Sequence, residues 1–338
     1  MIRYIVSILF IPFVMGCGAT ANDQQNNADV LAFVNPFIGT GSHGHTFPGA
    51  AYPSGMVQLS PDTGLEGWDR CSGYHYSDSS ITGFSLTHLS AIGRSDLMDV
   101  MLMPAVGKIK LNAGTSSKPG DGYRSRFSHD EETASPGYYK VKLKDYDITA
   151  ELTVSPRCGF HRYTFPASTT SHIVLDHSRH YATDSVQYTT LNVLDSCTIT
   201  GERKTKGWGE PGEKYRAHQQ LFYAIKVSKP FNASIAVDEN FIKGKTAAGR
   251  NVKAILNFET SKNEMVLVKV GISPVSIENA LENLLTEIPH WDFNETLTQT
   301  QLKWQQELAK IRINASEKIK TIFYTALYHS LITPEELQ

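Results

Sequence analysis

Short apolar or alternating segments follow one another between about residues 98 and 272. Representative runs are YYKVKLK (138–144), ITAELTV (148–154), LFYAIKV (221–227) and EMVLVKVGI (264–272). Each run has the length of a strand and is bounded by Gly, Pro, Asp or Ser, and its alternation is typical of strands with one buried face. The chain is therefore predicted to be mainly β, with a large antiparallel β-sandwich over residues 30–272.

The hydrophobic period changes from two to about 3.6 near Ser273, where Pro274 follows as a first-turn proline follows an N-cap. Apolar residues then recur at helical spacing in three stretches. The expected apolar faces are Ile277, Ala280, Leu281, Leu284 and Leu285 in the first; Leu297, Trp304, Leu308 and Ile311 in the second; and Ile319, Ile322, Phe323, Ala326 and Leu327 in the third. We expect a helical linker over 273–311 and the first helix of another domain within 312–338.

The N-terminus has the pattern of a lipoprotein signal over residues 1–17. A single cation, Arg3, precedes an apolar run that is too short for the roughly 20 residues of a membrane span, and Gly16 precedes Cys17. This favours cleavage that leaves Cys17 as the lipidated N-terminus, although an ordinary secretory signal or a short buried helix is the alternative. Residues 18–29 are polar and predict a flexible tether. No acidic cluster follows Cys17, so we expect an envelope protein on the periplasmic face.

Charge and cysteine content narrow the class of ligand. The net charge is −2 and no run of Lys or Arg occurs, which argues against nucleic acid. Beyond the signal, Cys71, Cys158 and Cys197 remain, without CxxC spacing, so at most one disulfide can form, and the pattern argues against a zinc site made of cysteines. Neutral, hydroxyl-rich ligands fit this composition better.

Two segments are too rich in Gly, Pro, His and aromatic residues for ordinary strands or helices: VNPFIGTGSHGHTFPGAAYPSGMVQLSPD (34–62) and GWDRCSGYHYSDSSITGFSLTHLSAIG (67–93). They predict shaped loops at a sugar site, because Trp68 offers a flat apolar face and Asp69 an acceptor for hydroxyl groups. The alternative for Trp68 is a side chain that seals the sandwich edge. His75 and His88 are further candidate sugar contacts, each equally consistent with a hydrogen-bonded structural histidine.

His43 and His45 form a His-x-His pair in the first of these loops. Such spacing places both rings on one side of a strand, where they could bind a metal ion. The sequence shows no evident third ligand, so loop-building is the favoured interpretation and no metal ligand is assigned.

These blocks resemble the family 92 glycoside hydrolases, and so do SRFSHDEETASPGYYKVKLKDYDITAELTVSPRCGFHRYTFP (125–166), VLVKVGISPVSIENA (266–280) and FYTALYHSLITP (323–334). The resemblance runs in order over about residues 30–334. It implies a calcium-dependent, inverting α-mannosidase with an N-terminal β-sandwich, a helical linker and an (α/α)6 barrel that carries the catalytic carboxylates. One departure stands after THLS, where Ala91, Ile92, Gly93 and Arg94 replace the usual second glycine and cysteine.

The resemblance also implies that both catalytic carboxylates and the barrel ligands of calcium lie further along the family's chain than residue 338. We therefore assign no catalytic residue, and we expect no calcium to bind this chain. The resemblance further implies that loops of the sandwich contribute side chains to the sugar pocket, and we assign this role to Trp68 and Asp69. The chain is predicted to be the N-terminal portion of a secreted enzyme that acts on α-mannoside glycans, and to be inactive alone.

Two alternatives stay open. One is a carbohydrate-binding or partner-binding lipoprotein, attached to the membrane only through its lipid, and the other is one half of a two-chain enzyme whose barrel domain is separately encoded. The helical stretches after Ser273 favour a portion of the enzyme, because their apolar faces need a partner surface.

Overall fold

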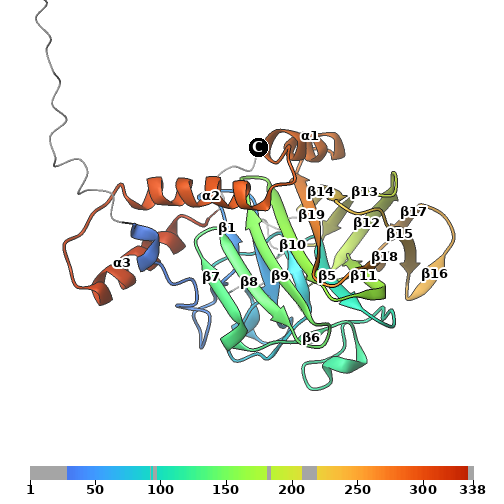
Figure 1. Cartoon of the computed structure of the whole chain (residues 1–338), viewed down its shortest axis with the longest axis horizontal. Helices are drawn as coiled ribbons and strands as arrows, with labels where there is room; N and C mark the ends of the chain where they lie inside the picture. The colour runs from blue at the N-terminus through green and yellow to red at the C-terminus, as the bar shows by residue number, and fades with distance from the viewer. Residues whose placement is uncertain (1–28, 92, 94–96, 181–183, 208–218, 334–338) are drawn as a thin grey trace, which may run out of the picture.

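Two antiparallel sheets pack against each other in the computed structural model, which describes residues 29–91, 93, 97–180, 184–207 and 219–333 (Figure 1). In spatial order, the eight-stranded sheet consists of β1 (Ala50–Ala51), β2 (Gln58–Asp62), β4 (Gly83–Ser85), β5 (Met101–Val106), β11 (Ser168–Asp176), β18 (Val252–Thr260), β15 (Asn232–Val237) and β16 (Asn240–Ile242). The nine-stranded sheet consists of β17 (Thr246–Gly249), β12 (Val186–Val193), β13 (Thr198–Thr205), β14 (Gln219–Val227), β19 (Glu264–Ser273), β10 (Cys158–Phe165), β9 (Ile148–Val154), β8 (Tyr138–Leu143) and β7 (Glu132–Ser135).

The remaining elements are short or helical. β3 (Ser80–Ile81) pairs with β6 (Ser125–Arg126), and the helices are α1 (Ile277–Glu287), α2 (Phe293–Leu308) and α3 (Glu317–Ser330). The 3₁₀ turns are η2 (Val30–Phe33), η3 (Trp68–Arg70), η4 (Pro119–Asp121) and η5 (His129–Glu131). None of the helices in the described part of the chain is long and apolar enough to cross a membrane.

Alternation along the strands creates the core between the sheets. In β9, Ile148, Ala150, Leu152 and Val154 are completely buried, whereas the residues at 149 and 151 between them are partly exposed. This is the period-two pattern of a strand with one face on the core. The predicted mainly-β sandwich is confirmed. The boundaries at residues 272 and 311 stay predictions, and the signal over 1–17 and the tether as far as residue 28 lie outside the described residues.

Helix α1 starts later than the sequence suggested. Its N-cap is Ser276, whose side chain accepts a hydrogen bond from the backbone N–H of Asn279, whereas Ser273 is the last residue of β19. The predicted cap at Ser273 is wrong because that residue continues the sheet ladder. Ala280 and Leu284 are buried, and α1 packs on β19 and β14, but Leu285 of the predicted face is 57% exposed.

Helix α2 lies along the sandwich (Figure 1), and Trp304 anchors it there. The indole is completely buried, and its Nε1 donates a hydrogen bond to the carbonyl oxygen of Ala51 in β1, at 2.7 Å. Leu308 is buried as well, while Ile311 lies beyond the end of the helix and is exposed. Since α1 and α2 both pack on the sandwich, the inference that these two helices need another part of the enzyme as their partner surface is wrong.

Helix α3 packs beside η2 at one end of the molecule (Figure 1), with Tyr324 stacked on Phe33. The side chain of Thr325 accepts the backbone N–H of Asn35, at 3.0 Å. The buried face of α3 thus consists of Tyr324, Thr325 and Tyr328. Of the predicted apolar face, Ile319, Ile322 and Ala326 are exposed, as expected for a face without a partner. Phe323 and Leu327 are instead partly buried against the core.

Candidate functional site

A tight loop brings two histidines to Asp69. Gly44 is essential to this loop, because a Cβ there would lie 2.1 Å from the carbonyl oxygen of Gly39. The Nδ1 of His43 donates a hydrogen bond to Asp69 Oδ1 at 2.5 Å, and His45 Nε2 lies 3.7 Å from the same oxygen. Residues that are 24 to 26 positions apart in the sequence therefore form one polar cluster.

Trp68 forms the wall of this cluster. Its indole Nε1 donates to the carbonyl oxygen of Gly93 at 2.7 Å, and its ring meets the ring of His45 edge-on with centroids 4.2 Å apart. The residue nevertheless remains 58% exposed. The indole is therefore held in place on one side and presents a flat apolar surface to solvent on the other. It does not seal the edge of the sandwich.

Asp69 is held in its charged form. The hydrogen bond from His43 is the largest cause that lowers the pKa of this carboxyl group, and the nearby rings of His43, His75 and His45 lower it further. A carboxylate with free lone pairs can accept hydrogen bonds from hydroxyl groups. Asp69 is consequently suited to binding a neutral polyol and unsuited to donating a proton.

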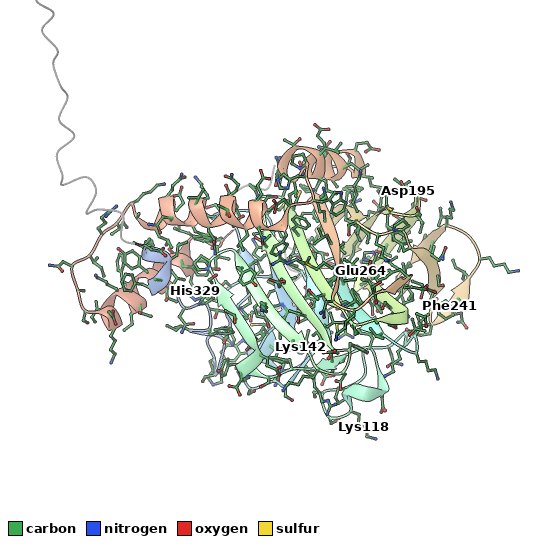
Figure 2. All side chains as sticks on the ribbon, viewed as in Figure 1. Lys118, Lys142, Asp195, Phe241, Glu264 and His329 are labelled. Atoms are coloured by element: carbon green, nitrogen blue, oxygen red, sulfur yellow. The ribbon has the colours of Figure 1, made fainter. Side chains whose placement is uncertain are left out.

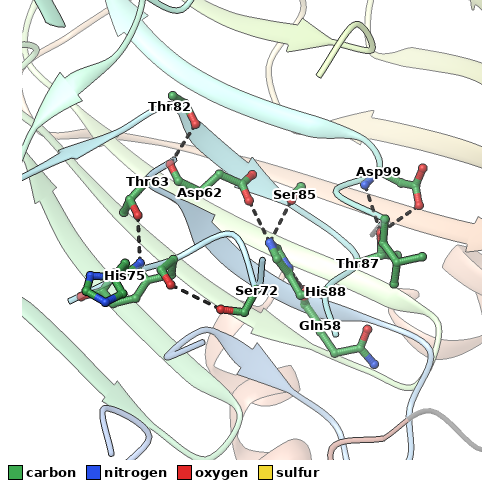
Figure 3. Close-up of polar contacts among 12 residues, drawn as sticks. Gln58, Asp62, Thr63, Ser72, His75, Thr82, Ser85, Thr87, His88 and Asp99 are labelled. Atoms are coloured by element: carbon green, nitrogen blue, oxygen red, sulfur yellow. Dashed lines mark hydrogen bonds and ion pairs between the residues drawn. The ribbon is translucent and has the colours of Figure 1, made fainter. Parts of the chain in front are cut away.

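His75 lies beside the cluster and helps to hold its loops together. Its Nε2 is 3.2 Å from the carbonyl oxygen of Ser42, and its Nδ1 is 2.8 Å from the hydroxyl of Ser77. Its backbone N–H donates to Thr63 Oγ1 (Figure 3). Both ring nitrogens thus have partners within the chain.

His88 lies inside the sandwich instead of at its surface. It is only 1% exposed, its Nδ1 is 2.7 Å from the carbonyl oxygen of Gln58, and its Nε2 is 2.8 Å from Asp62 and 3.1 Å from the hydroxyl of Ser85 (Figure 3). A direct sugar contact by this side chain is incompatible with that burial. Of the two interpretations that the sequence allowed, the hydrogen-bonded structural histidine describes His88.

The departure from the family pattern lies at the edge of this cluster. The backbone N–H of Ala91 donates to the carbonyl oxygen of His45 at 2.7 Å, and Gly93 accepts the hydrogen bond from Trp68. Both residues have positive φ angles, of 59° and 66°. Ile92 and Arg94 lie outside the described residues.

The donor set does not fit calcium. In the described part of the chain, His43, His45 and Asp69 form the one group of three or more His, Cys, Asp or Glu side chains whose ligand atoms converge. Calcium takes six to eight oxygen ligands, whereas this group offers two imidazoles and a single carboxylate. Sequence reasoning missed Asp69 as the partner of the His-x-His pair, because nothing in a linear pattern places residue 69 next to residue 43.

Comparisons with known proteins identify two matching family models. The glycosyl hydrolase family 92 N-terminal domain matches residues 33–273, and the glycosyl hydrolase family 92 catalytic domain matches residues 279–338.

Individual relatives are longer than this chain. An uncharacterized secreted glycosidase from Arthroderma benhamiae is 28% identical over 348 residues, which cover 92% of this chain and 42% of the relative. The structure of a family GH92 α-mannosidase from Bacteroides thetaiotaomicron is 37% identical to this chain and superposes with a TM-score of 0.86. The match covers 91% of this chain and 41% of the α-mannosidase. The structure of the same enzyme in complex with mannoimidazole is 36% identical, with a TM-score of 0.86. That match covers 91% of this chain and 40% of the enzyme. The chain spans about two fifths of the length of these relatives.

Proposed function

The chain belongs to glycoside hydrolase family 92, and from this membership we propose that it is the sandwich portion of an α-mannosidase, with Trp68 and Asp69 in contact with the mannoside. The observation that carries the proposal is the exposed indole of Trp68 next to the charged carboxylate of Asp69. The relative that is 37% identical is an α-mannosidase. This supports a mannoside as the sugar.

The two side chains have complementary roles in the proposal. The face of an indole can pack on the apolar C–H surface of a pyranose, and a carboxylate can accept hydrogen bonds from neighbouring hydroxyl groups. His43 fixes the Asp69 carboxylate by the 2.5 Å hydrogen bond. The sugar would therefore meet a preorganised surface.

The proposed acid and base come from the catalytic domain rather than from these loops. Inverting hydrolysis requires two carboxyl groups separated by roughly 6.5 to 9.5 Å, one of which must hold a proton. Asp69 has a lowered pKa, Asp62 is buried against His88, and Asp78 is bound by Arg70. The family is calcium-dependent in general, and since the described donor set does not fit calcium, we propose that those ligands also belong to the catalytic domain. The 338-residue chain assayed alone should not hydrolyse α-mannobiose.

Sugar binding by the chain tests the proposal directly. NMR line broadening of α-mannobiose should be observed with the unmodified chain, and Trp68→Ala or Asp69→Asn should each weaken binding by about 1 kcal/mol or more. Trp291→Phe is the matched control, because Trp291 is 39% exposed and contacts Lys269 rather than the cluster. Equal binding by all four proteins would refute a sugar contact at Trp68 and Asp69.

A second arrangement is a separately encoded catalytic domain that binds this chain. The exposed Ile319, Ile322 and Ala326 of α3 support it, since they form an apolar stripe in the stretch that matches the catalytic-domain model. In either arrangement, the proposed partner of this stripe is the helical catalytic domain.

We also propose that Cys17 anchors the protein in the cell envelope by a lipid, on the periplasmic face. The support is the short apolar run that ends in Gly16-Cys17, and an acyl chain contributes about 0.8 kcal/mol per buried CH₂. Replacing Cys17 by Ser should move the protein from the membrane fraction to the soluble fraction. Unchanged membrane retention would show that the N-terminus is held in another way.

A further inference from the structure

We infer that His43, His45 and Asp69 form a binding site for a divalent transition-metal ion of the zinc class. Their ligand atoms all lie within 4.8 Å of one another. Two imidazole nitrogens and one carboxylate oxygen, with a fourth position left for water or a ligand, are the donors that open zinc sites use.

The distances are close to those that a tetrahedral ion requires. Zinc–ligand bonds of about 2.0 to 2.2 Å place neighbouring ligand atoms roughly 3.3 to 3.6 Å apart. His45 Nε2 and Asp69 Oδ1 are already 3.7 Å apart. His43 Nδ1 is closer to the same oxygen, at 2.5 Å, but the His43 side chain is 68% exposed and has room to turn outward by the required ångström.

His45 supplies an independent indication of a cation. The residue is 6% exposed, and its Nε2 has no hydrogen-bond partner. The 3.7 Å separation from Asp69 Oδ1 is too long for a hydrogen bond. A buried ring nitrogen without a hydrogen-bond partner is unfavourable, and a cation between His45 Nε2 and Asp69 Oδ1 would satisfy both atoms.

The backbone holds His45 in this position. Its φ angle of 55° lies in the left-handed region that residues with a side chain rarely adopt. The turn before it depends on Gly44, which no larger residue can replace without a clash against Gly39. On the other side, the Trp68 ring covers His45 and limits the access of water.

The chemistry of the donors selects the metal. Imidazole favours Zn²⁺ and its neighbours in the first transition row, whereas Ca²⁺ and Mg²⁺ require oxygen ligands. A metal ion would displace the proton shared by His43 and Asp69, so its affinity should fall as the pH is lowered. The ligand set of this proposed site therefore differs from the oxygen ligands that calcium requires.

Calorimetric titration of the whole chain with zinc chloride tests the inference. The protein is purified without a polyhistidine tag and treated with a chelator beforehand. We expect one ion per chain, and little heat when calcium chloride replaces zinc. His43→Ala and His45→Ala should each weaken zinc binding at least about 100-fold, because even the loss of a residue that only orients a metal ligand costs 10- to 100-fold.

Two control variants remove other ligands that could bind zinc. His290→Ala eliminates a partly exposed histidine that lies near Glu295, and Cys197→Ser eliminates a partly exposed free thiol. Both should bind zinc within about twofold of the unmodified chain. A loss of binding in either control, with retention in His43→Ala, would place the ion elsewhere and overturn the inference.

Visible absorption of bound Co²⁺ gives a second readout that does not depend on sugar binding. The unmodified chain should produce the intense bands of a tetrahedral ion, and His43→Ala should abolish them. His43 is exposed, so this variant should melt at the same temperature as the unmodified chain in the absence of metal. No stoichiometric binding of zinc or cobalt at millimolar concentration would overturn the inference. Because neither His43 nor His45 is a proposed sugar contact, this result would leave the binding of α-mannobiose to Trp68 and Asp69 unaffected.

Discussion

Histidine side chains in this protein have roles that are set by the surroundings of each ring. His43 is exposed and binds a carboxylate, whereas His88 is buried among acceptors. His161 and His177 lie in the core, each beside a tyrosine hydroxyl, at 2.8 Å from Tyr163 and 2.7 Å from Tyr223. Burial lowers the pKa of both of these histidines to about 3.

The lowered pKa values of His161 and His177 predict an acid-sensitive fold. In the unfolded chain these rings take up protons near pH 6.5, but in the folded chain only near pH 3. Between these values the unfolded state binds more protons, so the free energy of unfolding falls as the pH is lowered, by up to about 1.4 kcal/mol per pH unit for each ring.

Urea denaturation at several pH values between about 7 and 4 checks this prediction. The variant His161→Phe should be less stable at neutral pH, because it loses the hydrogen bond to Tyr163, but its stability should decline less steeply with acid. Parallel pH profiles for the variant and the unmodified chain would contradict the assigned role of His161.

At the scale of single elements, α1 and α2 show how helices that follow a sandwich can become part of it. Ser276 and Asp292 cap the two N-termini with their side chains. The side chain of Thr300 in α2 packs against Gly137. A Cβ added to Gly137 would lie 2.5 Å from the Thr300 methyl group, so the glycine allows the helix to approach the sheet closely. The buried Trp304 then fixes α2 against β1.

Trp304→Ala should destabilise the protein by about 3 to 5 kcal/mol, because it removes a fully buried indole and leaves the carbonyl oxygen of Ala51 without its donor. Leu302→Ala on the same helix is the control, since Leu302 is 50% exposed and should change stability by no more than about 0.5 kcal/mol. Thermal unfolding monitored by circular dichroism distinguishes the two. A similar small effect of both variants would show that α2 is not a stable part of the sandwich.

At the scale of the whole molecule, the two ends differ. The end that carries α3 presents the exposed stripe Ile319, Ile322 and Ala326, and the opposite end carries β16 with the exposed Phe241 (Figure 2). α3 is also attached to the N-terminal segment, since His329 Nε2 lies 3.1 Å from the carbonyl oxygen of Ile38. One side of α3 is thus bound to the N-terminal segment, and the other side exposes its apolar residues to solvent.

The open side of α3 should cause self-association, because exposed apolar patches of a few hundred Å² or more commonly drive contacts between molecules. Light scattering should detect oligomers of the unmodified chain, and the double variant Ile319→Lys/Ile322→Lys should be monomeric. Phe241→Lys, at the other end, should leave association unchanged. A monodisperse monomer for the unmodified chain would remove the physical support for a partner on α3.

The sequence by itself determined the elements and the position of the loops that form the candidate site. Strands such as β9 and helices such as α1 were predictable because alternation and the 3.6-residue period are properties of a few consecutive residues. The density of Gly, Pro, His and aromatic residues likewise located the loops that carry Trp68 and Asp69. The family motifs added the expected fold and the mannoside that we propose as the ligand.

Only the tertiary structure decided which polar groups meet and which are buried. His75 and His88 were equivalent as sequence candidates, yet the path of β2 and β4 buries His88 against Asp62, whereas His75 remains at the loop surface. The same folding brings Asp69 to His43 and Trp304 to β1, across 26 and 253 residues. Such partners depend on long-range strand pairing and on the packing of distant segments, and no local pattern of side chains encodes these contacts.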